Sequence, residues 1–416
     1  MKLSKEQKTA IDGIIATLRS CRYGDRRWQF RDGFVLTIGG YAGTGKTTLL
    51  CEARKKIFKL FPHLNVAFVS FTGKASSVLK TKLENSKITY SQDSVGTIHS
   101  LIYVAETQYD QQLKTHVVIG WKLKDVDDLF ADLIIIDEAS MISKQIWNDL
   151  LKFGKGIIAV GDHGQLPPIG DQFSLLKDTD FQLTEIHRQA LDSPIIYLSK
   201  LIREEGHIPV DGFFSKEVFR LNWGSDRCKH IWNNKVVFDE GLMVLCGFNT
   251  TRCELNDIIR KKLNYDKKII PYPGERIVCL VNNHTTKIMN GQIGTLLWIM
   301  PDKHRLYRMT IDMGRDEPVE CMVSLKCFGE VTYTMYDQSK QYIQQRNYTN
   351  EKISSGVDFF DYGYAMSVHK SQGSEWDRVI VFEQRSRHWD DSMYARWLYT
   401  AVTRATKKLF VITNYF

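Results

Sequence analysis

The chain has 416 residues, of which 43% are hydrophobic and 25% are charged, and its formal net charge is +8. Such a chain can bury substantial hydrophobic cores, which excludes a disordered polymer and predicts about two to four globular domains. The positive charge favours a polyanionic partner such as nucleic acid, although a surplus of this size is weak evidence by itself.

The cysteines and the N-terminus exclude several other classes of protein. The eight cysteines form no Cys-x-x-Cys pair and no Cys/His spacing suited to zinc, so we expect free thiols. Residues 1–8 contain no apolar signal core, and no apolar run has the length of a membrane span. We therefore expect a soluble, cytoplasmic protein without a membrane partner.

Residues 40–48 read GYAGTGKTT and match the phosphate-binding pattern G-x-x-x-x-G-K-[ST]. An apolar, strand-like run precedes them and a helical stretch at 49–60 follows, which disfavours the alternative of a chance glycine-rich turn. The glycines turn backbone N–H groups toward a triphosphate, Lys46 reaches the β and γ phosphates, and the Thr47 hydroxyl can bind Mg²⁺. The residues expected to hold ATP in this loop are Gly43, Thr44, Gly45, Lys46, Thr47 and Thr48.

Residues 133–140 read LIIIDEAS, a buried-strand pattern that ends in two adjacent carboxylates. Asp137 is expected to hold the metal, and Glu138 to accept a proton from the attacking water. A pair of acids after a strand is usually a solvated turn. The phosphate-binding loop upstream makes ATP hydrolysis the better interpretation.

Strand-like and helical runs alternate along the chain, which predicts a parallel α/β sheet with its ligand at the carboxyl edge. The clearest strands are 35–38, 66–71, 133–137 and 157–160. A second α/β pattern starts near Gln182, includes 242–248, and resumes at 364–367 and 378–382. Turn-rich residues 271–357 between them suggest a small inserted barrel, in which the polar stretch 338–355 is expected to be a mobile loop.

Two basic stretches, residues 19–31 and 252–268, could contact nucleic acid, and the first interleaves arginines with aromatic residues. Most such runs are ordinary solvated faces, so this alternative stays open for both.

Four further segments resemble motifs III to VI of superfamily 1 helicases. They are 160–168 (VGDHGQLPP), 183–189 (LTEIHRQ), 367–375 (SVHKSQGSE) and 399–405 (YTAVTRA). With the two nucleotide motifs they span nearly the whole chain, and their order and spacing resemble the RecD-like 1B branch of DNA helicases, in particular its Dda-like phage group.

The resemblance implies an α/β fold of two RecA-like P-loop domains, with a small pin subdomain inserted in the first and a small SH3-like β-barrel in the second. The implied boundaries are 1–100 with 129–178 for domain 1A, 101–128 for pin subdomain 1B, 179–268 with 358–416 for domain 2A, and 269–357 for barrel 2B.

The resemblance also assigns roles around ATP. Gln7 corresponds to a glutamine that reads adenine, because one amide can both donate and accept. Gln165 corresponds to the motif III residue that senses the γ phosphate. Arg188 and Arg404 correspond to arginine fingers that stabilise charge on the transferred phosphoryl group, although either could be an interdomain ion-pair partner. Motif V adds Gln372 and Gly373 to the residues expected to bind the nucleotide.

The residues expected to contact nucleic acid are Phe71, Thr72, Lys74, His99, Trp121, His369 and Lys370. The polar members can donate to phosphates, and Phe71 could stack on a base. Many relatives carry proline at the position of Phe71, so this ring could instead cap the core. We expect residues 115–123 to form a hairpin around Gly120, with Trp121 at the duplex junction or as a packing residue.

The resemblance implies a monomeric, ATP- and Mg²⁺-dependent DNA helicase that moves 5′ to 3′ on single-stranded DNA and unwinds forked duplex in replication, recombination or repair. A single-strand-binding protein or another replication or recombination factor is an expected partner. The alternatives are the ATPase subunit of a RecD-like recombination complex, an ATP-switched single-strand-binding protein, and an RNA-directed enzyme.

Overall fold

The computed structural model describes residues 3–414 apart from 22–32, 111–114, 169–172, 187–191, 209–214, 235–237, 240, 266–269, 284–285, 287, 303–305 and 333–356. Arg188, most of the basic stretch 19–31 and the expected mobile loop 338–355 lie outside the described residues.

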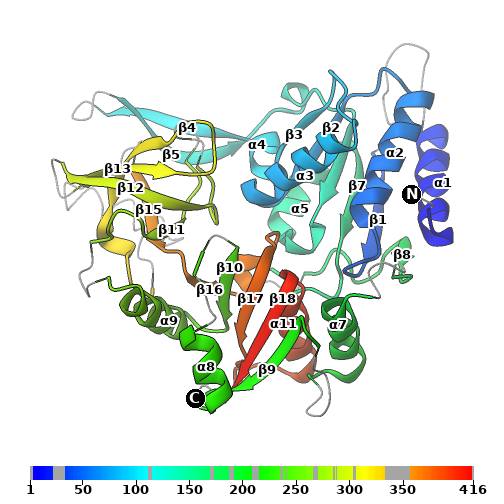
Figure 1. Cartoon of the computed structure of the whole chain (residues 1–416). Coiled ribbons are helices and arrows are strands. Elements are labelled where there is room, and N and C mark those ends of the chain that lie inside the picture. Colours follow the sequence, from blue (N-terminus) through cyan, green and yellow to red (C-terminus); the bar gives the residue numbers. More distant parts are fainter. Residues whose placement is uncertain are drawn as a thin grey trace. The chain divides into compact units, whose positions relative to one another are not determined.

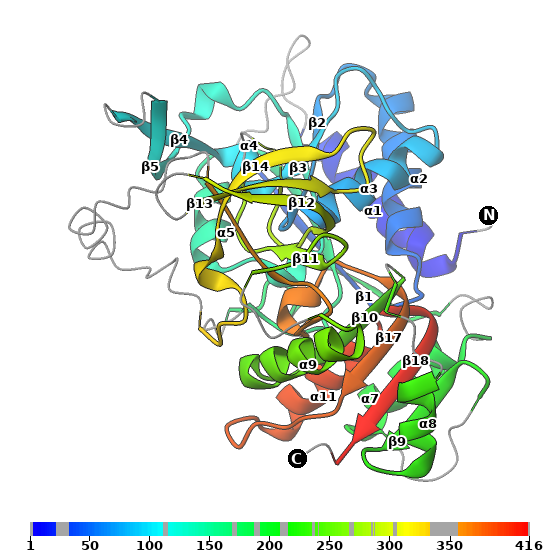
Figure 2. The same cartoon turned by 60° about the vertical axis from the view of Figure 1, so that its left-hand side comes forward.

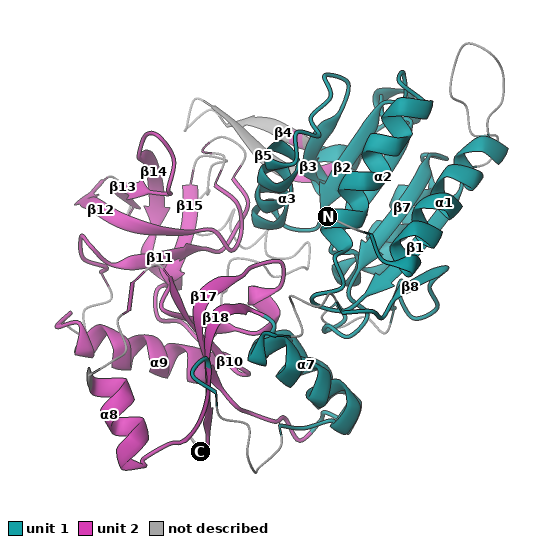
Figure 3. Ribbon diagram, turned by 45° about the vertical axis from the view of Figure 1, so that its right-hand side comes forward, with its two compact units in different colours: residues 1–104, 122–217, 388–403 teal, residues 105–121, 218–387, 404–416 magenta. Residues whose placement is uncertain are grey.

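The described chain divides into two compact units (Figure 3). Unit 1 contains residues 1–104, 122–217 and 388–403, and unit 2 contains 105–121, 218–387 and 404–416. The units do not coincide with the expected domains, because the segment 105–121 groups with unit 2 and the segment 388–403 groups with unit 1. The domain boundaries given above therefore stay predictions.

Unit 1 is built on a six-stranded sheet in which every neighbouring pair of strands is parallel, in the order β3-β2-β6-β7-β1-β8 (Figure 1). Its strands are β1 (Val35–Gly40), β2 (Val66–Ser70), β3 (Ser94–Thr97), β6 (Leu133–Asp137), β7 (Gly156–Gly161) and β8 (Phe181–Leu183). Its helices are α1 (Lys5–Ser20), α2 (Lys46–Leu60), α3 (Gly73–Asn85), α4 (Ile98–Ile102), α5 (Lys144–Leu151), α7 (Pro194–Glu205) and α11 (Asp391–Val402). The four clearest strands predicted from the sequence are confirmed.

Helices cover both faces of this sheet, which explains why its central strands are apolar throughout. Leu133 and Ile135 of β6 pack in one core with residues of α1, α2 and α3. Ile134 and Ile136 pack in a second core with residues of α4 and α5. Successive side chains of a strand point to opposite faces, so a run of four buried residues requires cover on both sides.

One strand corrects the sequence analysis. The second α/β pattern was expected to begin near Gln182, but β8 pairs with β1 through Ile38↔Phe181 and Gly40↔Leu183. β8 is therefore an edge strand of the first sheet. A three-residue strand carries too little pattern to show which of two sheets it joins.

The hairpin between α4 and β6 also differs from the prediction. Its strands are β4 (Tyr103–Asp110) and β5 (Thr115–Leu123), so residues 115–123 form one strand and Gly120 lies inside it. The prediction of a turn at Gly120 is wrong. A Cβ at Gly120 would lie 3.0 Å from a carboxylate oxygen of Glu106, so the glycine admits a close cross-strand neighbour.

Unit 2 combines a second sheet, in the order β16-β10-β17-β18-β9, with a closed barrel of five strands (Figure 1 and Figure 2). The sheet strands are β9 (Val218–Asn222), β10 (Leu242–Cys246), β16 (Ala365–Ser367), β17 (Trp376–Phe382) and β18 (Ala405–Thr413). The barrel strands are β11 (Arg276–Cys279), β12 (Ile293–Pro301), β13 (Leu306–Asp312), β14 (Val319–Ser324) and β15 (Val357–Tyr362). The helices are α8 (Asp226–Asn234) and α9 (Asn249–Lys262). The predicted fold class, with a second parallel sheet and an inserted small barrel, is confirmed.

Two buried ion pairs fasten α9 to the barrel. Arg252 pairs with Asp361 of β15, and Arg260 pairs with Glu275, which precedes β11. All four side chains are at most 3% exposed. These two arginines of the basic stretch 252–268 are therefore structural and do not form a solvated face.

Two expectations from composition can be compared with the structure. All eight cysteines are free thiols. Within the described ranges, none of the helices has both the length and the apolar character needed to cross a membrane.

Replacement of Arg260 by alanine should lower the free energy of unfolding by about 3–5 kcal/mol, because it leaves the buried Glu275 carboxylate without its cation. Urea unfolding followed by near-UV circular dichroism measures this loss. The exposed neighbour Lys261 is the control, and Lys261→Ala should stay within about 0.5 kcal/mol of the wild type. Equal effects of the two substitutions would contradict the assigned role of the ion pair.

Candidate ATP-binding and strand-binding sites

The phosphate-binding loop connects the end of β1 to the start of α2 in unit 1. Gly43 and Gly45 have φ values of 80° and 76°, a left-handed backbone that favours glycine. Gly45 immediately precedes α2, so the unpaired N–H groups of the first helical turn face the loop. This is the geometry that binds a phosphate at a helix N-terminus.

Lys46 is held by the loop itself. Its Nζ donates to the carbonyl oxygens of Gly40 at 2.7 Å and Tyr41 at 3.1 Å. It also lies 3.7 Å from a carboxylate oxygen of Asp162. To reach a phosphate, the ammonium group must exchange these oxygens for those of the nucleotide.

Two carboxylates lie at the end of β6, and the second of them has an unusual backbone conformation. Glu138 has φ 57° and ψ 41°, a left-handed conformation that is uncommon for a residue with a side chain. The Asp137 carboxylate accepts the Glu138 N–H at 3.0 Å. Strained residues of this kind concentrate at functional sites, where the surrounding structure holds them in place.

The loop after β7 carries motif III. Asp162 is fully buried, and its carboxylate accepts the Gly164 N–H at 2.9 Å. Gln165 is 4% exposed, and its side-chain oxygen has no hydrogen-bond partner among the described residues. A buried amide oxygen without a partner is costly, so this group is available for a ligand or water.

Helix α11 contacts both loops inside unit 1. The Tyr399 hydroxyl donates to Asp162 at 2.7 Å and accepts the Ala42 N–H of the phosphate-binding loop at 2.8 Å. The Leu166 N–H donates to the Thr400 hydroxyl at 3.0 Å. Asp162 and Tyr399 both lie in segments that resemble helicase motifs, but the sequence predicted no role for either residue. The sequence signal that could have identified them is a polar side chain within an otherwise apolar segment, close to the end of a strand.

An aromatic and cationic cluster covers the same loop. The Tyr41 ring lies 4.2 Å from that of His163, and the Arg203 guanidinium lies 3.5 Å over Tyr41. Burial lowers the pKa of His163 below its ordinary value, so this ring is neutral at pH 7.

Gln7 has partners inside the protein. Its amide nitrogen donates to the carbonyl oxygens of Thr44 and Gly45, both at 3.2 Å, and its amide oxygen accepts the Ser4 N–H. Adenine recognition by Gln7 stays a prediction, and it requires these bonds to be exchanged. The adjacent Glu6 accepts the N–H groups of Thr184 and Glu185, just before the undescribed Arg188.

Unit 2 brings Arg404 of motif VI to motif V. Arg404 is 4% exposed and donates to the carbonyl oxygen of Ser374 at 3.1 Å. Gln372 is buried and Gly373 has φ 71° in the turn just before Ser374. Arg404 thus contacts the turn that follows Gln372 and Gly373 through Ser374, and a nucleotide shared by these residues stays a prediction.

Four residues that are expected to contact DNA follow β2 and β3. These two β-strands are parallel neighbours and pair through Ser70↔Thr97. Phe71 is half-buried against the core, and its ring meets that of His99 edge-on at 6.1 Å. Thr72 caps α3 by accepting the Ala75 N–H, and Lys74 follows in the first turn of that helix. Packing of Phe71 against the core favours the capping role over base stacking.

The other two expected contacts, His369 and Lys370, lie in the turn after β16 of unit 2. Both are half-buried. Burial lowers the pKa of His369 below its ordinary value and the pKa of Lys370 to about 8. Lys370 is therefore mostly charged at pH 7, whereas His369 is mostly neutral.

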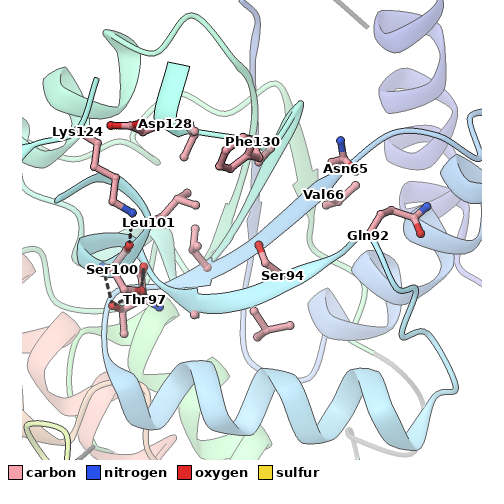
Figure 4. A pocket seen from close by; sticks show the side chains of 15 residues that line it. Asn65, Val66, Gln92, Ser94, Thr97, Ser100, Leu101, Lys124, Asp128 and Phe130 are labelled. Atoms are coloured by element: carbon pink, nitrogen blue, oxygen red, sulfur yellow. Dashed lines mark hydrogen bonds between the residues drawn. The ribbon is translucent and has the colours of Figure 1, made fainter. Parts of the chain in front are cut away.

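The remaining expected contact, Trp121, is 46% exposed near the end of β5. It therefore lies at the base of the hairpin. Near that base, a hollow of about 410 Å³ lies against β2 and β3, where the Lys124 ammonium donates to the Ser100 carbonyl oxygen at 2.9 Å (Figure 4). None of the expected strand contacts lines this hollow.

The residues expected to hold the metal suit Mg²⁺. Thr47 supplies a hydroxyl oxygen in the first turn of α2, and Asp137 supplies carboxylate oxygens at the end of β6. Hard oxygen donors without sulfur or imidazole favour Mg²⁺ over softer metals. No group of three or more potential His, Cys, Asp or Glu ligands occurs in the described ranges, so a preformed all-protein cage is absent there.

Comparisons with known proteins agree with this geometry. Residues 29–214 match the AAA domain family, and residues 362–412 match the UvrD-like helicase C-terminal domain. The ATP-dependent DNA helicase Dda of Enterobacteria phage T4 is 24% identical in an alignment that covers 99% of each chain. The chain is thus similar to helicases of superfamily 1, and the relatives it matches include members of the RecD-like branch.

The chain is also similar to the ATP-dependent RecD2 DNA helicase of Deinococcus radiodurans, which is 25% identical over 90% of the chain. The chain spans 46% of RecD2 and 36% of a Methanocaldococcus jannaschii relative, so it is much shorter than both.

Solved structures of Pif1 helicases share the fold. One, described at forked double-stranded DNA, has a TM-score of 0.55 and 18% identity and covers 99% of this chain and 92% of its own. A Bacteroides Pif1 in complex with ADP-AlF3 and single-stranded DNA has a TM-score of 0.53 and 19% identity and covers 100% of this chain and 93% of its own.

Proposed function

We propose that this chain is an ATP-driven DNA helicase that moves 5′ to 3′ along single-stranded DNA and unwinds forked duplex. The observation that carries the proposal is the set of chemical groups at one edge of the unit 1 sheet. The phosphate-binding loop follows β1, Asp137 and Glu138 follow β6, and the loop with Gln165 follows β7, all from mutually parallel strands.

The proposed roles in ATP hydrolysis follow from the chemistry of each side chain. Lys46 binds the β and γ phosphates, while Glu138 accepts the proton of the attacking water. Thr47 and Asp137 hold Mg²⁺, which neutralises charge on the phosphates when it is bound. Gln165 contacts the γ phosphate through its unpaired amide oxygen or its amide nitrogen. Arg404 and Arg188 supply permanent positive charge to the transferred group.

Relatives support both the nucleotide and the DNA. Dda and RecD2 are named as ATP-dependent DNA helicases. Similar Pif1 structures contain ADP-AlF3 and single-stranded DNA or concern forked duplex. On this basis, we propose that Thr72, Lys74, His99 and Lys370 bind strand phosphates. The direction of movement rests on the resemblance to the 1B branch.

A second candidate function is the ATPase subunit of a larger recombination complex. The RecBCD enzyme subunit RecD of Haemophilus influenzae is 22% identical over 92% of this chain. Such a subunit would hydrolyse ATP on DNA without unwinding alone. The main proposal also includes a role in replication, recombination or repair. It further includes action as a monomer and recruitment by a single-strand-binding protein.

Unwinding of two labelled duplexes, one with a 5′ tail and one with a 3′ tail, tests the main proposal. ATP-dependent unwinding from the 5′ tail alone is expected, with Lys46→Ala as the blank because it lacks the phosphate-binding ammonium group. Unwinding from the 3′ tail alone overturns the direction. Strand-stimulated ATPase without unwinding of either substrate favours the subunit.

Replacement of Glu138 by glutamine tests its role as the base. The amide cannot accept the water proton, so turnover of ATP should fall by about 10²–10⁴-fold. Affinity for ATP, measured with a fluorescent analogue, should stay near that of the wild type because Lys46 and the loop are intact. Wild-type turnover in this variant would remove Glu138 from the mechanism.

The Lys370 contact should make DNA affinity depend on pH. Because the pKa of Lys370 is about 8, its side chain is positively charged below that pH and loses the charge above it. Single-strand affinity should therefore fall between about pH 7 and pH 9. Lys370→Arg should reduce the fall because a guanidinium stays charged. Lys74→Arg is the matched control and should keep it; the same pH dependence in both variants would count against Lys370.

A further inference from the structure

Helix α11 ends two residues before Arg404, yet its last two turns are bonded to loops of unit 1. The Tyr399 hydroxyl joins the Ala42 N–H to the Asp162 carboxylate, and Thr400 accepts the Leu166 N–H. Tyr399 is fully buried. One hydroxyl thus bridges the phosphate-binding loop and the motif III loop.

The Asp162 carboxylate is a buried charge with few neighbours that can stabilise it. Its exposed fraction is zero, and among the described residues it contacts the Tyr399 hydroxyl, the Gly164 N–H and, at 3.7 Å, the Lys46 ammonium. A buried carboxylate requires paired charge or donated hydrogen bonds. Its cation is the same lysine that must bind the nucleotide.

We propose that Tyr399 is a positioning residue that stabilises Asp162 when Lys46 leaves it for the phosphates of ATP. This inference rests on the proposed ATP site. Before binding, Asp162 has Lys46 close by and hydrogen bonds from Gly164 and Tyr399. After Lys46 turns to the phosphates, the Gly164 N–H and the Tyr399 hydroxyl hold the carboxylate. The hydroxyl also fixes the Ala42 N–H, so the loop keeps its shape while its lysine moves.

If Tyr399 had only a structural role, loss of its hydroxyl should have the same effect on ATP binding as loss of the hydroxyl of Tyr364 in unit 2. Tyr364 is 3% exposed, and its hydroxyl accepts the Arg276 N–H at 3.2 Å. It lies outside the ATP loops, so Tyr364→Phe is the matched control for loss of a buried tyrosine hydroxyl.

The test is the affinity of the full chain for a fluorescent, non-hydrolysable ATP analogue, measured by anisotropy. Tyr399→Phe should weaken binding by about tenfold. Once Lys46 has moved to the phosphates, the Asp162 carboxylate of this variant lacks both its cation and the hydrogen bond from the Tyr399 hydroxyl. Tyr364→Phe should leave affinity unchanged, even if thermal unfolding shows that both variants lose similar stability. Wild-type affinity in Tyr399→Phe would overturn the proposal and leave the tyrosine a structural role.

A second substitution tests the route through Asp162. In Asp162→Asn no carboxylate competes for Lys46, so the analogue should bind at least as tightly as to the wild type. Adding Tyr399→Phe to this variant should change affinity by less than about twofold, because a neutral amide needs the hydroxyl less. A tenfold loss in that background, or weaker binding by Asp162→Asn alone, would overturn the proposal.

The same assay separates this proposal from the helicase function. Lys46→Ala should not bind the analogue. If this variant binds it with wild-type affinity, the assignment of the ATP site is wrong. If the wild type binds the analogue but unwinds no tailed duplex, the helicase function fails, while the Tyr399 and Asp162 variants still decide the inference.

Discussion

The parallel pairing of β1, β7 and β6 is the constraint on which the ATP site depends. Ile38 pairs with Val160, and Ile136 pairs with Ala159, so the three strands end at the same edge of the sheet. Lys46, Asp137 and Asp162 are far apart in the sequence, yet Asp137 is the last residue of β6 and the other two follow the ends of β1 and β7. Because both faces of the sheet are packed with apolar side chains, this register cannot slip without exposing a core.

The parts of the site that follow local rules could be predicted from the sequence. The phosphate-binding loop needs glycine at fixed positions and a helix immediately after it, and both are visible in residues 40–48. The buried strand before Asp137 is equally plain. Long-range hydrogen bonds leave no local pattern, so the contacts of Tyr399 with Ala42 and Asp162, across more than half of the chain, could not be predicted.

Errors in the fold prediction have a related cause. Gly120 looks like a turn residue, but a glycine inside a strand also permits a close cross-strand side chain, here Glu106. Arg252 and Arg260 look like surface charge, but they lie eight residues apart on one face of α9, opposite buried acids of the barrel. The number of arginines therefore overstates the cations available to DNA, whereas the net charge is unaffected because each buried pair is neutral.

The buried charges of unit 1 suggest how nucleotide binding changes the protein. Lys46 neutralises Asp162 in this structure, so transfer of Lys46 to a phosphate exchanges one buried partner for another. Such an exchange is favourable only if the abandoned carboxylate keeps enough donors, and these come from the motif III loop and from α11. Since α11 leads directly into Arg404, the group that stabilises Asp162 and the expected finger belong to one continuous segment.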